Sequence, residues 1–289
     1  MQRIGALDLS LSKQQIAGMY DKRADTYDEN PFQPSICKRV LHHARCSPGH
    51  NLLDIGTGTG HIAFAVAEAL GPDGSVLGVD ISPKMLDKAE SKLQASGLKN
   101  VRFMLADAEA LDTKEECPLE HFDRILCANT FPWMENKPET LKSWLSLLKP
   151  GGVLVCHTPA AKTHIGAVVL ESVFQKYGVR IDARSAYPGT ASTSIQDYTK
   201  LFSDAGFTAV EVIDEPDTRY TSVDKVLGMW NLVVNVPMSF QGLEQLSIAD
   251  VSAAKADFNR EVLALSTESG ILEDMTALFI VACKSGTSG

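Results

Sequence analysis

The stretch Leu53-Asp54-Ile55-Gly56-Thr57-Gly58-Thr59-Gly60 decides the fold of this chain. An apolar run precedes it, and a helical apolar pattern over 61–70 follows it, so the glycines lie between a predicted strand and a predicted helix. Glycine lets the backbone turn sharply and approach a ligand with no Cβ in the way. A helix that begins at such a loop also offers free N–H groups. The stretch therefore predicts a strand–loop–helix unit that holds a ligand.

Strands and helices alternate outward from this stretch. Short apolar runs predict strands at 51–55, 75–79, 101–105, 124–128 and 153–157, and helical patterns lie between them at 61–70, 83–96 and 138–148. Such alternation predicts a parallel sheet covered on both faces. Right-handed crossovers then place ligands at the carboxyl ends of the strands.

The pattern becomes looser after Gly151-Gly152. Helices are predicted at 162–177 and 195–205, and two more strands at 209–213 and 276–283. Some sixty residues separate these two strands, and they contain helical patterns at 222–234 and 248–266. A long insertion with its own helices is typical of a lid or substrate cap, with a stabilising appendage or an oligomer interface as the alternative.

We therefore predict an α/β, Rossmann-like fold, with a seven-stranded mostly parallel sheet, helices on both faces and a helical cap. The chain is interpreted as a single domain over 1–289, with cap segments 1–30, 158–192 and 215–272.

The glycine spacing argues against a dinucleotide cofactor. The dinucleotide pattern is Gly-x-Gly-x-x-Gly, whereas the sixth position counted from Gly56 is His61. The observed order is Gly-x-Gly-x-Gly, which disfavours a nicotinamide dehydrogenase because the pyrophosphate of NAD or FAD needs the helix end.

Four motifs, in order and at fitting spacing, resemble the class I methyltransferases that use S-adenosylmethionine (SAM). They are the glycine stretch, Asp80 after the second strand, Asp107 after the third, and Lys149-Pro-Gly-Gly152 before the fifth. The segment from Tyr20 to Asp28 is similar to one in the ubiquinone/menaquinone-biosynthesis-like (type 11) small-molecule branch. The resemblance covers roughly residues 15 to 157.

The resemblance implies a cofactor site. Asp80 would accept hydrogen bonds from the ribose hydroxyls, and Asp107 from the adenine amine, as carboxylates can. Either acid, taken alone, can also be an ordinary loop acid or a helix N-cap. Tyr20 and Tyr27 are seven residues apart and share a helical face, which also fits simple packing. The implied cofactor-binding residues are Tyr20, Tyr27, Asp54, Gly56, Thr57, Gly58, Gly60, Asp80, Ile81, Met85, Asp107, Ala108 and Asn129.

The reaction expected is methyl transfer to an apolar or aromatic small molecule, with O-methylation first and N- or C-methylation next. A base is needed only if the nucleophile must lose a proton. His157, at the end of the fifth strand, and His164 are the candidates, although packing explains both. Trp133, Trp230 and Asn231 are candidate substrate contacts, with packing again the alternative.

Charge and composition disfavour several classes of binding partner. The net charge of −9 over 289 residues, with no long basic cluster, disfavours nucleic acid. No apolar run is long enough to span a bilayer, and no secretory signal is visible. The scattered cysteines form no metal-ligand pattern and fit a reduced, cytoplasmic protein. We expect a monomer or homodimer without a metal.

A second hypothesis belongs to a different class. Some proteins of this fold bind SAM or its product without transferring methyl, as scaffolds, regulators or rearrangement catalysts. The glycines and acids predict cofactor binding under both hypotheses, and only product analysis separates them.

Overall fold

The chain forms two compact units. The computed structural model describes residues 7–29, 33–160, 164–181, 193–234, 240–241 and 243–286. Unit 1 comprises Met1–His157, Ile195–Ile213 and Phe279–Gly289, and unit 2 comprises Thr158–Ser194 and Asp214–Leu278. Parts of the predicted cap segments lie outside the described residues, namely 1–6, 30, 161–163, 182–192, 235–239 and 242.

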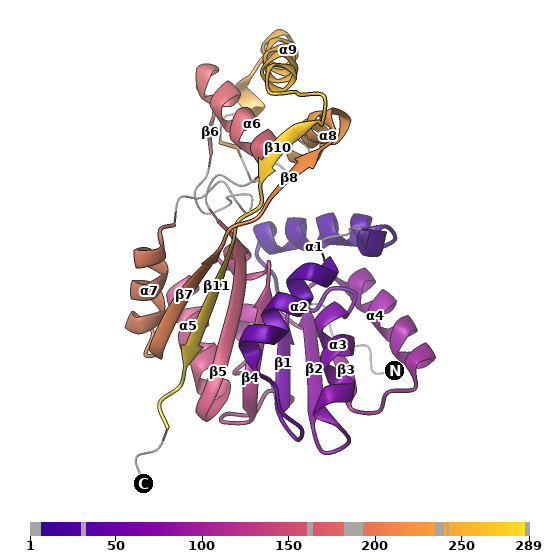
Figure 1. Ribbon diagram of the computed structural model, residues 1–289, viewed down its shortest axis with the longest axis vertical. Helices are drawn as coiled ribbons and strands as arrows, with labels where there is room; N and C mark the ends of the chain where they lie inside the picture. Colours follow the sequence, from indigo (N-terminus) through magenta and orange to yellow (C-terminus); the bar gives the residue numbers. More distant parts are fainter. Residues whose placement is uncertain are drawn as a thin grey trace. The chain divides into compact units, whose positions relative to one another are not determined.

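A seven-stranded sheet is the centre of unit 1 (Figure 1). Its order is β3-β2-β1-β4-β5-β11-β7, and the pairs from β3 to β5 are parallel. Strand β1 is an inner strand, because Leu53 pairs with Leu77 on one side and Ile125 on the other. The Rossmann-like prediction is confirmed. The strands are β1 (Asn51–Ile55), β2 (Ser75–Asp80), β3 (Val101–Leu105), β4 (Phe122–Ala128), β5 (Leu148–Pro159), β7 (Thr208–Glu215) and β11 (Ala277–Cys283).

Strand β11 differs in direction from the parallel strands. The Gly151 N–H donates to the Lys284 carbonyl and the Lys284 N–H donates to the Gly152 carbonyl, while the Ala160 N–H donates to Thr276. One residue number rises as the other falls, so β11 is antiparallel to β5. The sheet is therefore mostly parallel, as predicted.

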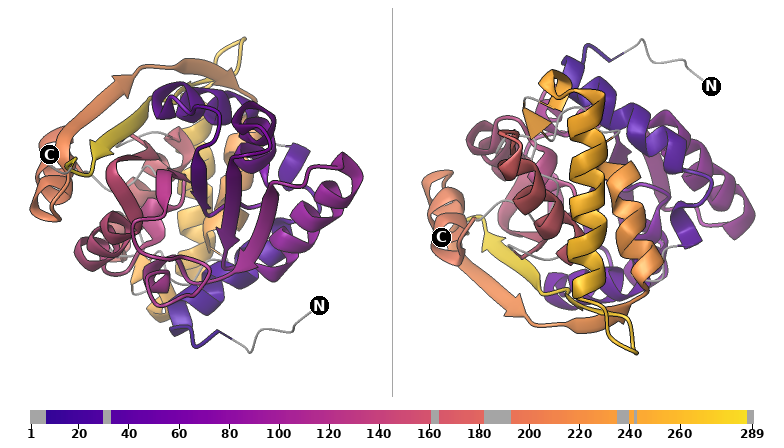
Figure 2. Two further views of the ribbon diagram at one scale, coloured as in Figure 1. Left: turned by 90° about the horizontal axis from the view of Figure 1, so that it is seen from below. Right: turned by 90° about the horizontal axis from the view of Figure 1, so that it is seen from above.

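Helices cover both faces of this sheet (Figures 1 and 2). The chain moves from β1 through β2 to β3 in one direction and from β4 to β5 in the other, so right-handed crossovers place the helices on opposite faces. One face carries α2 (Gln33–Ala44), α3 (His61–Leu70) and α4 (Pro83–Ser96), and the other carries α5 (Lys137–Leu147) and α7 (Ile195–Asp204).

The predicted fifth strand began too late. Strand β5 begins at Leu148, which pairs with Phe122, and the register shifts between Phe122 and Arg124. The segment from Lys149 to Gly152, predicted as a turn before the strand, is part of the irregular strand itself. Hydrogen bonds of Gly151 and Gly152 to Lys284, the residue after β11, hold it there.

The N-terminal segment belongs to unit 1. It forms α1 (Leu11–Arg23) and the short 3-10 helix η1 (Tyr27–Glu29). Ser10 caps α1 by accepting from the Lys13 N–H at 3.2 Å. Helix α1 also contacts α4.

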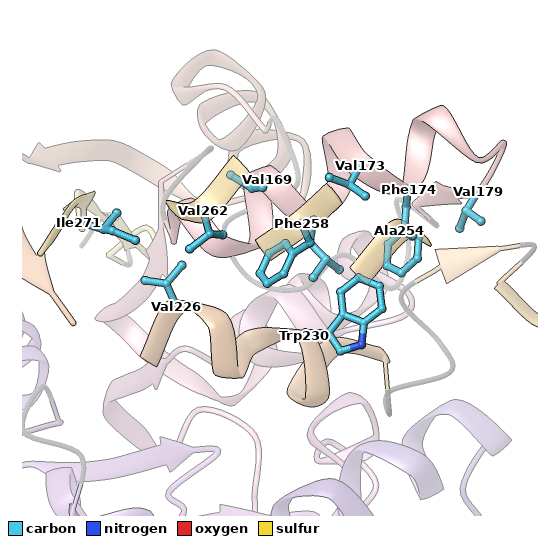
Figure 3. Close-up of a cluster of buried hydrophobic side chains, with 11 residues drawn as sticks. Val169, Val173, Phe174, Val179, Val226, Trp230, Ala254, Phe258, Val262 and Ile271 are labelled. Carbon is cyan, nitrogen blue, oxygen red and sulfur yellow. The ribbon is translucent and has the colours of Figure 1, made fainter. Parts of the chain in front are cut away.

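Unit 2 has a core of its own between three helices. These are α6 (Ile165–Lys176), α8 (Val223–Val234) and α9 (Ile248–Ala264). Trp230 stacks on Phe174 with ring centroids 5.4 Å apart and contacts Phe258 at 5.7 Å (Figure 3). Two small antiparallel sheets complete the unit, β8 (Thr218–Thr221) with β10 (Ile271–Asp274), and β6 (Arg180–Ile181) with β9 (Phe240–Gln241). Fully buried aromatic rings of this kind indicate a packed core.

Two findings concern membranes and metals. No helix in the described part of the chain is long and apolar enough to cross a bilayer. Within the same residues, no group of three or more His, Cys, Asp or Glu side chains is placed to hold a metal ion.

Candidate cofactor site

A pocket of about 720 Å³, partly open to solvent, lies in unit 1 at the carboxyl ends of the parallel strands. Most of the predicted cofactor residues meet here, although they come from distant parts of the sequence. The lining residues are Lys13, Ile16, Tyr20, Tyr27, Gly56, Gly58, Val79, Asp80, Ile81, Met85, Ala106, Asp107, Ala108, Ala128, Asn129, Thr130, Trp133 and Met134.

The glycine loop forms the base of the pocket. Gly56 and Gly58 have φ values of +69° and +56°, in the region that favours glycine. A Cβ on Gly56 would lie 1.9 Å from Thr130 Oγ1, so the loop packs directly on the chain after β4. A Cβ on Gly58 would meet only Tyr27 Cε1, at 3.7 Å. Gly56 is therefore needed for packing, while Gly58 leaves space on the pocket side.

Asp80 organises this loop from the end of β2. Its Oδ2 accepts from the Gly58 N–H and its Oδ1 from the Ser82 N–H, both at 2.8 Å. Burial raises the pKa of this carboxyl, against the effect of the N–H donors. The carboxylate can still accept a further donor from the pocket.

Asp107, at the end of β3, is held from two sides. Its Oδ1 accepts from the Glu109 N–H at 3.0 Å, and its Oδ2 lies 2.7 Å from Lys13 Nζ. Lys13 Nζ is also 2.7 Å from Glu109 Oε2. Burial lowers the pKa of Lys13, but its hydrogen bonds to the two carboxylates raise it more. Sequence analysis missed Lys13 because no local motif links it to Asp107; only its helical spacing from Ile16 and Tyr20 is a signal.

Aromatic rings form one wall of the pocket. The Tyr20 ring packs edge-on against Tyr27 at 6.3 Å and against Trp133 at 6.4 Å. The Arg23 guanidinium lies 5.5 Å from the Tyr20 ring centre and 5.9 Å from that of Tyr27. Among the described residues, the buried Nε1–H of Trp133 has no hydrogen-bond partner. Tyr20, Tyr27 and Trp133 thus come together at the pocket.

Polar contacts attach the N-terminal segment to the loops after β1 and β2. Asp28 accepts from Thr59 Oγ1 at 2.5 Å and pairs with Lys92 at 2.6 Å. His61 Nε2 is 2.9 Å from Asp28 Oδ1, but its N–H is not aimed well enough for a hydrogen bond. Asp21 accepts from Ser82 Oγ at 2.6 Å. The segment is therefore held across the end of the sheet.

A smaller pocket is lined by four predicted residues, of which Asp54 and Thr57 do not line the larger pocket. Asp54 is 1% exposed and accepts from Thr57 Oγ1 at 2.7 Å. Burial raises the pKa of the Asp54 carboxyl to about 7. Gly60, with φ +89°, lines neither pocket and begins α3.

Asn129 adopts a left-handed backbone conformation that residues other than glycine take infrequently. Its φ is +59°, directly after β4, and its N–H donates to the His157 carbonyl at 3.0 Å. Backbone strain of this kind costs of order 1–3 kcal/mol and clusters at functional sites. Asn129 lines the pocket, as does Thr130.

The predicted bases lie elsewhere. His157 is 3% exposed, packs on the Phe279 ring at 5.0 Å and is not among the pocket-lining residues. His164 lies in unit 2 at the start of α6 with φ +61°, and burial lowers its pKa. Their roles stay predictions.

The predicted contacts on α8 also lie in unit 2. Trp230 is 4% exposed within the core of that unit, and Asn231 is exposed. A substrate contact by Trp230 would require its ring to leave the stack with Phe174. Both assignments stay predictions.

Comparison with known proteins gives the family. The family model described as a methyltransferase domain matches residues 47–206, more than half of the chain. This chain belongs to that methyltransferase family. It is a class I enzyme that uses SAM, which confirms the resemblance seen in the sequence and disfavours a nicotinamide dehydrogenase.

Two relatives show how far the likeness extends. A demethylmenaquinone methyltransferase of Geobacillus kaustophilus is 28% identical over 189 residues, which is 60% of this chain and 77% of the relative. Aklanonic acid methyltransferase DauC of a Streptomyces species is 28% identical over 149 residues, 51% of this chain and 66% of DauC. The likeness thus covers 60% of this chain for the first relative and 51% for the second.

Solved structures agree on the fold. The YcgJ protein of Bacillus subtilis has a TM-score of 0.58 and 18% identity, covering 87% of this chain and 98% of that one. A phosphoethanolamine N-methyltransferase of Haemonchus contortus, solved with S-adenosylhomocysteine, has a TM-score of 0.53 and 17% identity, covering 87% and 52%.

The residues present fit SAM. Gly58 leaves open space where a Cβ would project, and the Asp80 carboxylate beside it can still accept a further donor. These features suit a polar nucleoside held close to the backbone.

Proposed function

We propose that this methyltransferase acts on an apolar or aromatic small molecule, with oxygen as the first candidate acceptor and nitrogen or carbon next. The observation that carries the proposal is the pocket wall formed by Tyr20, Tyr27 and Trp133, to which Ile16 and Met134 add apolar surface. Aromatic walls favour apolar, planar ligands. Two relatives support the class, since they are named for demethylmenaquinone and aklanonic acid, both small organic molecules.

We place the cofactor along the strand ends. Asp80 would bind the ribose hydroxyls, and Ile81 and Met85 would flank the adenine, whose edge faces Asp107 and Ala108. The methionine part would lie along the glycine loop toward Asn129. This placement is supported by the meeting of these residues in one pocket, and it leaves the wall with Trp133 for the substrate.

The residues of this chain would act mainly by positioning. Bound SAM would supply a methyl group on a cationic sulfur, and the sulfur would leave as a nucleophile attacks the methyl carbon from the opposite side. Holding the two reactants in register can contribute several kcal/mol. Tyr20 and Tyr27 close one side of the pocket and would exclude water, while strained Asn129 would orient the reacting groups.

A general base is needed only when the atom that receives the methyl group must lose a proton. For a phenol or alcohol, His157 and His164 remain the proposed bases, because imidazole titrates near neutrality. The lowered pKa of His164 keeps its ring neutral and able to accept a proton at pH 7.

Unit 2 is the proposed substrate cap. Its first segment follows β5 directly, and its second lies between β7 and β11, so both connect to strands of the main sheet. Trp230 and Asn231 would contribute there. We further propose a monomer or homodimer that does not bind nucleic acid, consistent with the net charge of −9. The free cysteines fit the reducing cytoplasm.

The test is product analysis with labelled SAM. The protein is incubated with a panel of phenols, quinols, amines and aliphatic acids, and S-adenosylhomocysteine and labelled products are quantified. Label in an aromatic or apolar product supports the proposal, and mass fragmentation identifies the accepting atom. Label found only in polar aliphatic products contradicts it. Cofactor binding with no transfer to any compound would favour the hypothesis of a non-transferring SAM binder.

A further inference from the structure

The unexplained feature of the pocket is the ammonium group of Lys13 in its wall. Lys13 lies in the first turn of α1, where the helix dipole disfavours a positive charge. The side chain is nevertheless only 12% exposed. A residue that breaks a local rule and is then ordered by tertiary contacts is a candidate for a functional role.

The partners of Lys13 are themselves fixed. Glu109 accepts from the backbone N–H groups of Glu135 and Asn136, at 3.1 and 2.7 Å, and from Thr140 Oγ1 at 2.9 Å. Burial raises the pKa of Glu109, but its hydrogen bonds to Lys13 and to these three groups lower that pKa by more than burial raises it. The carboxylate therefore stays charged. Glu109 does not line the pocket, whereas Lys13 and Asp107 do. Glu109 thus anchors Lys13 from behind.

This anchoring determines how Asp107 faces the pocket. Both of its oxygens are engaged, one by the Glu109 N–H at 3.0 Å and one by Lys13 at 2.7 Å. Rotation of the carboxylate would break a charge-assisted hydrogen bond. Each oxygen can still accept one more donor. Without the ammonium group, Asp107 and Glu109 would face each other as like charges and Asp107 would turn away.

We propose that Lys13 is a specificity-determining positioning residue, which holds Asp107 as the acceptor for the 6-amino group of the cofactor's adenine. The inference rests on the proposed placement of adenine at Asp107. It adds that the base is read correctly only when α1 is in place, because Lys13 belongs to that helix. A 6-oxo base offers an acceptor where Asp107 needs a donor, and the site rejects it.

The experiment compares two ligands on the full-length protein. Calorimetry measures the dissociation constants of S-adenosylhomocysteine and of its 6-oxo analogue, and the readout is their ratio. A hydrogen bond to a charged group predicts that the natural protein prefers the 6-amino ligand by about tenfold or more. In Lys13→Met the ratio should fall to within about threefold of unity, mainly because the 6-amino ligand binds more weakly. Lys13→Arg should keep most of the preference, since Arg can bridge two carboxylates.

Two further variants separate the causes. Lys88→Met removes an ion pair of 2.7 Å between α4 and Asp25, which also holds the N-terminal segment but is exposed, and it should leave the ratio unchanged. Asp107→Asn should lower the ratio, because an amide can donate to the 6-oxo group. Thermal unfolding identifies variants that do not fold, and Lys13→Gln replaces Lys13→Met if that variant fails.

The outcomes are distinct. If Asp107→Asn lowers the ratio but Lys13→Met does not, Lys13 is only a strut and the inference is overturned while the adenine placement stands. Equal weakening of both ligands in Lys13→Met overturns it too. If Asp107→Asn leaves the ratio unchanged, the adenine lies elsewhere and the placement itself fails.

Discussion

Replacing Gly58 by alanine should separate cofactor binding from folding. Gly58 has φ +56°, and an added Cβ would meet only Tyr27, at an ordinary contact distance of 3.7 Å. Folding should therefore lose only the cost of a left-handed alanine, about 1–2 kcal/mol. The methyl group would occupy the pocket base, where overfilling costs about 1–3 kcal/mol. Cofactor affinity should fall by about 5- to 150-fold.

Gly97 provides the matched control. It follows α4 with φ +74°, and an added Cβ would have no heavy atom within 4 Å. Gly97→Ala should thus lose a similar free energy of unfolding in urea while binding S-adenosylhomocysteine normally in a calorimeter. If Gly58→Ala is folded and binds S-adenosylhomocysteine as tightly as the natural protein, the cofactor does not lie against the glycine loop and the reasoning is refuted.

Three further substitutions test other parts of the site. Asp80→Ala should weaken S-adenosylhomocysteine by about 1.5–3 kcal/mol in calorimetry; unchanged affinity would mean that the ribose lies elsewhere. Native Asp54, with a pKa of about 7 against 3.8 in the unfolded chain, keeps a proton that the unfolded chain releases. The free energy of unfolding therefore falls as pH rises from about 4 to 7, by up to about 4 kcal/mol. Urea melts at pH 5 and 8 should show part of this loss in the natural protein and none of it in Asp54→Asn. An identical pH dependence in both proteins speaks against a buried neutral acid. His157→Ala should lower turnover while S-adenosylhomocysteine affinity stays within about twofold; equal turnover would eliminate it as the base.

The motif residues were predictable because of the topology. Parallel strands bring their carboxyl ends to one edge, so residues that follow β1, β2 and β3 in the sequence must meet there. That is why the order of the motifs along the chain is enough to assign Gly56, Gly58, Asp80 and Asp107 to one site. The same loop argued against a dinucleotide cofactor, because the dinucleotide pattern has a glycine where this chain has His61.

What the sequence could not show was long-range packing. Lys13 is 94 positions from Asp107, and its helical spacing from Ile16 and Tyr20 does not by itself show that it reaches that carboxylate. His157 was predicted at the mouth of the sheet from its position at the end of a strand, but its ring packs on Phe279, more than a hundred residues later. Trp230 similarly stacks on Phe174 of another helix. Side-chain direction at a strand end depends on such partners, which periodicity does not contain.

The most direct test of the cofactor placement is a crystal structure of the full-length protein with S-adenosylhomocysteine. We expect the ribose hydroxyls within hydrogen-bond distance of the Asp80 carboxylate, the adenine between Ile81 and Asp107, and the homocysteine along Gly56 and Gly58. An adenosyl group bound outside this pocket, or one whose ribose does not contact Asp80, would contradict the account.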